Sequence, residues 1–245
     1  FAVVSCRHDK PIPQYKTKNV IVIVMDGPRY SETWGDSTHQ YIPRMANELL
    51  PHGIISTQFY NNGQTYTTAG HTAITTGNYQ EINNGGLELP ESPSIFQYWL
   101  KKYNVDTTAA WIIASKDKLA ILADCQNSDW AGTYNPSTNC GINGQGTGYR
   151  DDSLTLEVTK TILTNYHPQM ALINFREPDF SGHQNNWTNY TKGISDVDEY
   201  IYQIWNFIES DPVYKGTTTL FVTNDHGRHL DTVSIGFPGH GDSCD

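Results

Sequence analysis

Four runs of apolar, mostly β-branched residues lie far apart along the chain. Continuous runs of this kind, without a polar residue at every second position, are typical of strands that are buried on both faces of a sheet. We predict strands at residues 20–25, 108–114, 170–175 and 218–223.

The segments between these runs carry apolar residues three and four positions apart, the spacing of one face of an α-helix. We predict helices at residues 41–50, 94–103, 153–166 and 187–210. The apolar stripe of the last segment is expected to pack in the core. The alternation of strands and helices predicts an α/β protein with an open, mostly parallel sheet.

The chain of 245 residues is long enough for one large domain or two small ones. No linker rich in Pro, Gly or Ser divides it, so we predict a single domain over residues 19–245. The formal net charge of −10 argues against a nucleic-acid scaffold, because phosphate backbones are bound mostly by clustered Lys and Arg.

Short clusters of Asp, His and Gly follow three of the predicted strands, and a fourth lies close to the end of the sequence. They are Met25-Asp26-Gly27, Glu177 to His183, Asn224 to Gly227 and Gly239-His240-Gly241. We expect the first three along one edge of the sheet, where α/β enzymes place their chemistry. Buried carboxylates there need neutralising, and a divalent metal ion does this well. The clusters predict a metal-dependent hydrolase.

A threonine-rich segment, residues 64–77, completes the predicted chemistry. A hydroxyl group at the N-terminus of a helix faces unpaired N–H groups and the positive end of the helix dipole, which favour its alkoxide. A metal ion in contact would lower the hydroxyl pKa further and produce a nucleophile. Taken alone, the segment also fits an ordinary capped helix.

The first residues predict export. Val3-Val4-Ser5-Cys6 resembles the end of a bacterial signal peptide, with Cys6 as the lipidated residue; a frayed strand is the alternative. We therefore expect residues 1–18 to be a signal-peptide tail and tether, and the protein to be periplasmic or anchored to the outer membrane through lipid alone. Cys125 and Cys140 bracket a polar stretch and form a disulfide or stay as free thiols.

Together these motifs resemble the alkaline phosphatase superfamily, particularly its nucleotide pyrophosphatase/phosphodiesterase branch. The matching motifs are Asp26 after a strand, a Thr before Gly70-His71-Thr72-Ala73-Ile74-Thr75-Thr76-Gly77, Pro178-Asp179 with Gly182-His183, and Asp225-His226-Gly227. Their order and approximate spacing agree over residues 19–227. The resemblance implies an α/β three-layer sandwich, with a mostly parallel central sheet and helices on both faces.

The resemblance also implies two divalent metal ions, Zn²⁺ in the first place and Mn²⁺ as the alternative. The ligands of one ion would be Asp26, Thr67, Asp225 and His226. Those of the other would be Asp179, His183 and a late histidine, for which His240 is the candidate and His229 the competitor. Thr67 would be the nucleophile, with Thr68 as the alternative.

Two features depart from the family pattern. Gly70 stands where the family often has an Asn that holds a phosphoryl oxygen, so backbone N–H groups or an arginine must serve instead. We predict substrate contacts at Gly70, Arg29 and Arg228, with plain surface charge as the alternative for the two arginines. His240 follows the Asp-His-Gly motif closely, which fits a compact loop or a natural chain that continues past Asp245.

The predicted reaction is in-line displacement at the phosphorus of a small-molecule phosphate ester, by a phosphodiesterase or phosphatase. The nucleophile segment lacks the Cys/Ser-x-Pro-x-Arg context of sulfatases, which argues against sulfate esters. A phosphonate hydrolase or a phosphotransferase would share the metal site. An exported binding or glycan-handling protein with a degenerate metal site is the alternative from another class.

Overall fold

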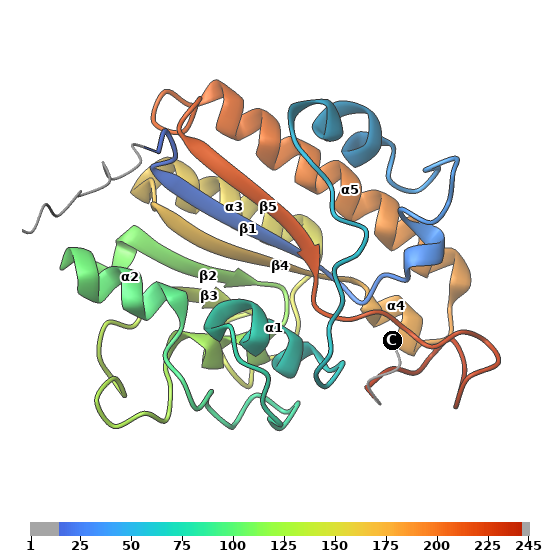
Figure 1. Cartoon of the computed structure of the whole chain (residues 1–245), viewed down its shortest axis with the longest axis horizontal. Coiled ribbons are helices and arrows are strands. Elements are labelled where there is room, and N and C mark those ends of the chain that lie inside the picture. The colour runs from blue at the N-terminus through green and yellow to red at the C-terminus, as the bar shows by residue number, and fades with distance from the viewer. Residues whose placement is uncertain (1–14, 242–245) are drawn as a thin grey trace, which may run out of the picture.

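The computed structural model describes residues 15–241. The proposed lipidation site Cys6 and most of the expected tether lie outside the described residues. One five-stranded sheet organises the described part (Figure 1), in the order β3-β2-β4-β1-β5, and all of its pairings are parallel. The strands are β1 Asn19–Asp26, β2 Ala110–Ala114, β3 Ser137–Cys140, β4 Met170–Pro178 and β5 Thr218–Asn224.

Within residues 15–241, five α-helices and several short helical turns connect the strands. The α-helices are α1 Thr67–Thr76, α2 Ile95–Tyr103, α3 Asp152–Tyr166, α4 Asp179–His183 and α5 Trp187–Ser210. The short turns are Tyr30–Glu32, Met45–Leu49, Leu50–His52, Thr107–Ala109 and Asp117–Ala123. The predicted α/β class with a parallel sheet is confirmed. Among residues 15–241, no helix is long and apolar enough to cross a membrane.

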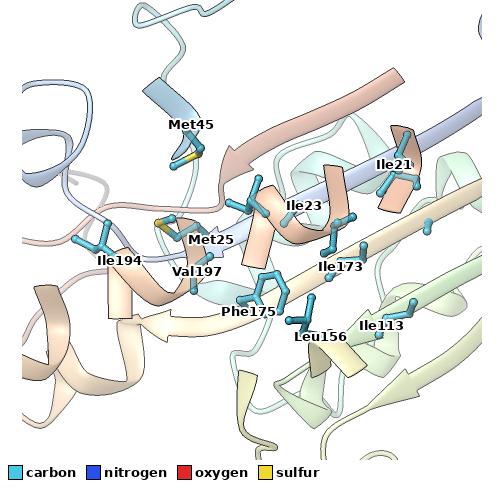
Figure 2. Close-up of a cluster of buried hydrophobic side chains, with 14 of the residues drawn as sticks. Ile21, Ile23, Met25, Met45, Ile113, Leu156, Ile173, Phe175, Ile194 and Val197 are labelled. Carbon is cyan, nitrogen blue, oxygen red and sulfur yellow. The ribbon is translucent and has the colours of Figure 1, made fainter. Parts of the chain in front are cut away.

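Helices cover both faces of the sheet, because successive side chains of a strand point to opposite sides. Ile21, Ile23 and Ile173 belong to the core cluster that α3 and α5 cover (Figure 2). Val24 and Leu172, from the same two strands, belong to a second cluster with residues of α1 and α2. Three layers result, as the family resemblance implies.

Two elements differ from the sequence-based prediction. β3 was not predicted, because its sequence Ser-Thr-Asn-Cys is polar and only Cys140 is fully buried. Residues 41–50 do not form a regular α-helix but a π-helical turn followed by a 3₁₀ turn. The carboxylate of Asp198 accepts the backbone N–H groups of Arg44 and Met45, which binds this segment to α5. Cys125 and Cys140 are buried free thiols.

The end of β4 is irregular. Met25 pairs with Phe175, but Asp26 pairs with Pro178, so two residues of β4 have no partner in β1. The carboxylate of Asp152 accepts the N–H groups of these two residues, Arg176 and Glu177. Buried N–H groups need such partners, and the bulge sets the direction in which the chain leaves the sheet toward α4.

Candidate active site

Three aspartates meet at the carboxyl edge of the sheet. Asp26 ends β1, Asp179 follows β4 as the first residue of α4, and Asp225 follows β5. The three strands are neighbours in the sheet, with β1 in the middle. All three side chains are almost fully buried. The predicted convergence at this edge is therefore present in the structure.

The first group of possible ligands, called here the Asp26 group, consists of Asp26, Asp225 and His226. His226 Nε2 lies 3.4 Å from Asp26 Oδ1 and 3.4 Å from Asp225 Oδ2. Its Nδ1 lies 2.8 Å from the carbonyl oxygen of Gly227, which directs Nε2 toward the carboxylates. Within residues 15–241, neither Asp225 Oδ2 nor His226 Nε2 has a hydrogen-bond partner, although both are buried.

The second group, called here the Asp179 group, consists of Asp179, His183 and His240. Asp179 Oδ1 lies 3.4 Å from His183 Nε2 and 3.3 Å from His240 Nε2. His183 lies one helical turn after Asp179, whereas His240 comes from a segment 57 residues after His183. The Nε2 atoms of the two histidines lie 2.9 Å apart. His240 Nδ1 faces the carbonyl oxygen of Thr65 at 2.7 Å, so its Nε2 is the atom presented to the group. The competing residue His229 is not part of either group.

These donors fit divalent metal ions. Carboxylate oxygens and imidazole nitrogens are the usual ligands of Zn²⁺ and related ions. Donor atoms of the Asp179 group lie within 4.8 Å of one another. The same holds for Asp26 with Asp179 and His226, and for Asp26 with His71 and Asp225. The buried Asp225 Oδ2 and His226 Nε2 would gain, from a bound cation, the partner that desolvated polar atoms require. The residues present therefore match a metal centre.

Thr67 is the first residue of α1, and its side chain is buried beside both groups. Its Oγ1 accepts a hydrogen bond of 3.1 Å from Lys116 Nζ. The hydroxyl of Thr68 is directed elsewhere, to the backbone oxygen of Asn83 and to Asn84 Oδ1. Of the two candidate nucleophiles, Thr67 is the one adjoining the aspartates.

Lys116 is a residue that the sequence-based prediction missed. Its Nζ donates to Asp26 Oδ1 at 2.8 Å and to Asp179 Oδ2 at 2.6 Å, besides Thr67. Burial by itself would lower the pKa of Lys116, but the carboxylates of Asp179 and Asp26 outweigh it and raise the pKa above its usual range. The available signal was a lysine two positions after a predicted strand, which resembles ordinary surface charge.

The ammonium group changes the titration of its partners. Burial would raise the pKa of Asp26 and of Asp179, but Lys116 and the neighbouring histidines together hold both pKa values below their usual range. Burial lowers and the Asp225 carboxylate raises the pKa of His226, with a net rise to about 9. Ligands must be deprotonated to bind a metal ion, so a metal ion bound at His226 would release a proton from it.

Asn84 and Lys118 extend the site past the N-terminus of α1, and neither was predicted. Asn84 Oδ1 accepts from the backbone N–H of Thr68 at 3.2 Å and from Lys118 Nζ at 2.9 Å. Burial, together with the nearby charge of Lys116, lowers the pKa of Lys118 to about 8. An amide and a titratable ammonium group therefore lie one residue from the candidate nucleophile.

Gly70, Arg29 and Arg228, the predicted substrate contacts, are engaged with the protein itself. The N–H of Gly70 donates to Tyr66 O within α1, and a Cβ at this position would lie 2.4 Å from the carbonyl oxygen of Asp225. Arg29 donates to Glu32 and to the carbonyl oxygen of His229. Both arginines are less than a tenth exposed.

Two buried residues, Asn174 and His71, contact the aspartates of the Asp26 group. Asn174 Nδ2 donates to Asp26 Oδ2 at 3.0 Å and also lies 3.2 Å from His71 Nε2. His71 Nδ1 lies 2.8 Å from the carbonyl oxygen of Thr67 and 3.2 Å from Asp225 Oδ2. His71 therefore lies between the nucleophile turn and Asp225, in contact with both.

Residues 18–234 match the metalloenzyme superfamily, and the chain belongs to this family. The superfamily assignment made from the motifs is thereby confirmed. Among curated proteins, a 2,3-bisphosphoglycerate-independent phosphoglycerate mutase of Ureaplasma urealyticum is 31% identical over 72 residues, which is 29% of this chain and 13% of the mutase.

Solved structures share the fold. A member of the alkaline phosphatase superfamily from Vibrio parahaemolyticus has a TM-score of 0.62 and 15% identity, over 91% of this chain and 58% of that protein. The lipoteichoic acid synthase LtaP from Listeria monocytogenes has a TM-score of 0.60 and 12% identity, over 93% and 60%. Murine ectonucleotide pyrophosphatase/phosphodiesterase 5 has a TM-score of 0.56 and 16% identity, over 85% and 57%. The chain thus spans about three fifths of these structures.

Proposed function

We propose that this chain hydrolyses phosphate esters of small molecules, as a phosphodiesterase or phosphatase, with Thr67 as nucleophile and two divalent metal ions, most readily Zn²⁺. The observation that carries the proposal is the position of Thr67 Oγ1. It shares the ammonium group of Lys116 with Asp26 and Asp179, one carboxylate from each ligand group. The hydroxyl therefore adjoins both proposed metal positions.

The Asp26 group together with Thr67 would hold one ion, and the Asp179 group the other. When bound, two such cations lower the pKa of an adjacent hydroxyl, polarise a phosphoryl oxygen and stabilise a leaving alkoxide. Mn²⁺ is the alternative ion, because carboxylate-rich sites also accept it.

The side chains of this chain supply the covalent steps. The Thr67 oxygen attacks phosphorus in line, and the bond from phosphorus to the ester oxygen breaks; that oxygen leaves with the electron pair and takes up a proton. Water then attacks the phosphothreonine, the bond from Oγ1 to phosphorus breaks, and phosphate leaves while Thr67 regains its proton. Lys116 donates to Thr67 itself, and Lys118 bonds Asn84 beside the next residue, Thr68. The two ammonium groups would be the donors that face the phosphoryl oxygens.

Metal analysis and turnover test this proposal together. We expect two equivalents of Zn²⁺ or Mn²⁺ per chain by mass spectrometry, and hydrolysis of p-nitrophenyl phosphate or bis-p-nitrophenyl phosphate. Thr67→Ala should reduce kcat at least about 10³-fold, as is usual for a covalent nucleophile, while Thr68→Ala should retain most of it. The reverse pattern would assign the nucleophile to Thr68. A metal-free chain without turnover that binds a glycan would instead favour the binding-protein alternative.

A phosphotransferase is the second candidate, and a phosphonate hydrolase ranks behind it. The short match to a phosphoglycerate mutase favours transfer of the phosphoryl group to a second alcohol. The buried pair of lysines, Lys116 and Lys118, also suits a substrate with a second anionic group. Phosphorus NMR with added alcohols separates release of inorganic phosphate from transfer.

Export and lipid anchoring at Cys6 are proposed on the N-terminal sequence alone. On this proposal the protein would be periplasmic or held at the outer membrane by lipid.

A further inference from the structure

Arg228 makes contacts that connect several parts of the candidate site. Its Nε donates to the carbonyl oxygen of Phe237 at 2.9 Å, and its Nη2 to that of Pro238 at 2.7 Å. Its Nη1 donates to Asp179 Oδ1 and lies 3.4 Å from the carbonyl oxygen of Asp179. Its side chain is 0% exposed where it pairs with Asp179. Four of its five N–H groups are thus accounted for by protein oxygens.

Each partner of Arg228 belongs to a segment that carries a proposed metal ligand. Pro238 lies two residues before His240, and Asp179 is itself a ligand. Arg228 lies two residues after His226 in the loop that follows β5. One guanidinium group therefore joins the ends of β4 and β5 to the loop that presents His240. Asp179 is 49 residues from Arg228 along the chain, whereas Pro238 is only 10 residues from it.

The guanidinium group of Arg228 is tightly packed against Gly182 and Phe237. A Cβ at Gly182 would lie 2.5 Å from the central carbon of the guanidinium group and 2.5 Å from its Nε. Phe237 covers the group at 5.7 Å from its ring centroid. A glycine in the middle of α4 costs helix stability, so its presence where Arg228 passes indicates a tight fit around the arginine.

We propose that Arg228 is a positioning residue for the second metal ion, a role that rests on the proposed two-metal function. It fixes the orientation of Asp179 Oδ1, the atom that both His183 Nε2 and His240 Nε2 face. It also holds the Phe237–Pro238 backbone and with it His240. Partners that orient ligands in this way typically change metal affinity or activity about 10- to 100-fold when they are removed.

Arg228→Lys tests the role, because lysine keeps the charge but cannot bond these four oxygens in the planar geometry of arginine. Zn²⁺ titration by calorimetry should show two sites in the wild type. In the variant we expect one site to weaken about 10- to 100-fold and the other to keep its affinity. Co²⁺ bound at the weakened site should change its visible absorption spectrum, a readout that is independent of turnover.

Arg150→Lys is the matched control. Arg150 is also buried and donates to backbone carbonyl oxygens, those of Ala114 and Asn139, but it contacts no proposed ligand. We expect it to lose folding stability while both Zn²⁺ affinities remain at the wild-type level. Gly182→Ala displaces the guanidinium group without removing it, so it should also weaken Zn²⁺ affinity at one site. This variant replaces Arg228→Lys in the test if Arg228→Lys does not fold.

The outcomes separate the two proposals. Wild-type protein that binds no metal overturns both the two-metal function and this role. Wild-type protein with two sites, and an Arg228→Lys variant with the same two affinities, overturns only the positioning role. An increase in KM with unchanged metal binding would overturn it as well and assign Arg228 to the substrate.

Discussion

Replacing Lys116 with methionine separates the electrostatic role of this residue from its packing. Methionine retains most of the apolar stem, but it removes the ammonium group that bonds Asp26 and Asp179. Lys116 and both carboxylates are each at most 2% exposed, so water cannot replace the lost charge. The structure therefore predicts a specific loss of folding stability when no metal ion is bound.

The magnitude follows from the burial of the three groups. Removing one partner of a buried ion pair typically costs about 3–5 kcal/mol, because the remaining charge stays desolvated. Here two carboxylates lose a common partner, and uptake of a proton by one of them limits the cost to the same range. Two divalent ions, one bound at Asp26 and the other at Asp179, would neutralise both carboxylates, and the loss should then fall to about 1 kcal/mol or less.

Urea unfolding at pH 8 measures both quantities, once with a chelator and once with saturating Zn²⁺. We expect Lys116→Met to be less stable than the wild type by about 3–5 kcal/mol with chelator, and nearly equal to it with Zn²⁺. Lys118→Met is the control, since Lys118 bonds Asn84 rather than a carboxylate and burial has already lowered its pKa to about 8. Equal stability of Lys116→Met and wild type in chelator would refute the reasoning.

Two further predictions concern residues that support the site. Gly70→Ala should destabilise the fold by about 1–3 kcal/mol, as overpacking does. It should also weaken Zn²⁺ binding, because the added Cβ would lie 2.4 Å from the backbone oxygen of Asp225. Calorimetry that finds a more stable variant would contradict this prediction. Burial raises the pKa of Asp152 from 3.8 to about 6. Asp152 therefore binds a proton more tightly in the folded state than in the unfolded state. This difference contributes about 3 kcal/mol of folding stability below pH 3.8, and the contribution is lost as the pH rises through about 6. Asp152→Asn should abolish that part of the pH dependence in chemical unfolding, and an unchanged profile would argue against it.

Hydrophobic patterning predicted four of the five strands in the described part of the chain, and three of its long helices. Such patterns are local, and they report directly whether a segment is buried on one face or on two. β3 was not predicted because a short polar strand at the edge of a sheet has no such pattern. Residues 41–50 do not form the predicted regular helix. Their backbone is bound instead by Asp198, a residue more than 140 positions away.

The residues of the candidate site also divide into those that could be predicted from the sequence and those that could not. Asp26, Asp179 and Asp225 could be placed at one edge because each follows a strand, and parallel strands bring their carboxyl ends together. Lys116 could not be recognised, since a lysine after a strand is usually solvated. Its burial between two aspartates depends on β2 and β4 being neighbours, and the order of strands in a sheet is not encoded in any single segment.

The sequence by itself determined the α/β class, the family and the residue types that can bind metal ions, because apolar periodicity and short motifs act over a few residues. Only the tertiary structure decided that Lys116 reaches both ligand groups, that Gly70 packs on Asp225, and that Arg228 faces Asp179 rather than solvent. Those contacts join segments that are distant along the chain, and they form only when the strands and helices have packed.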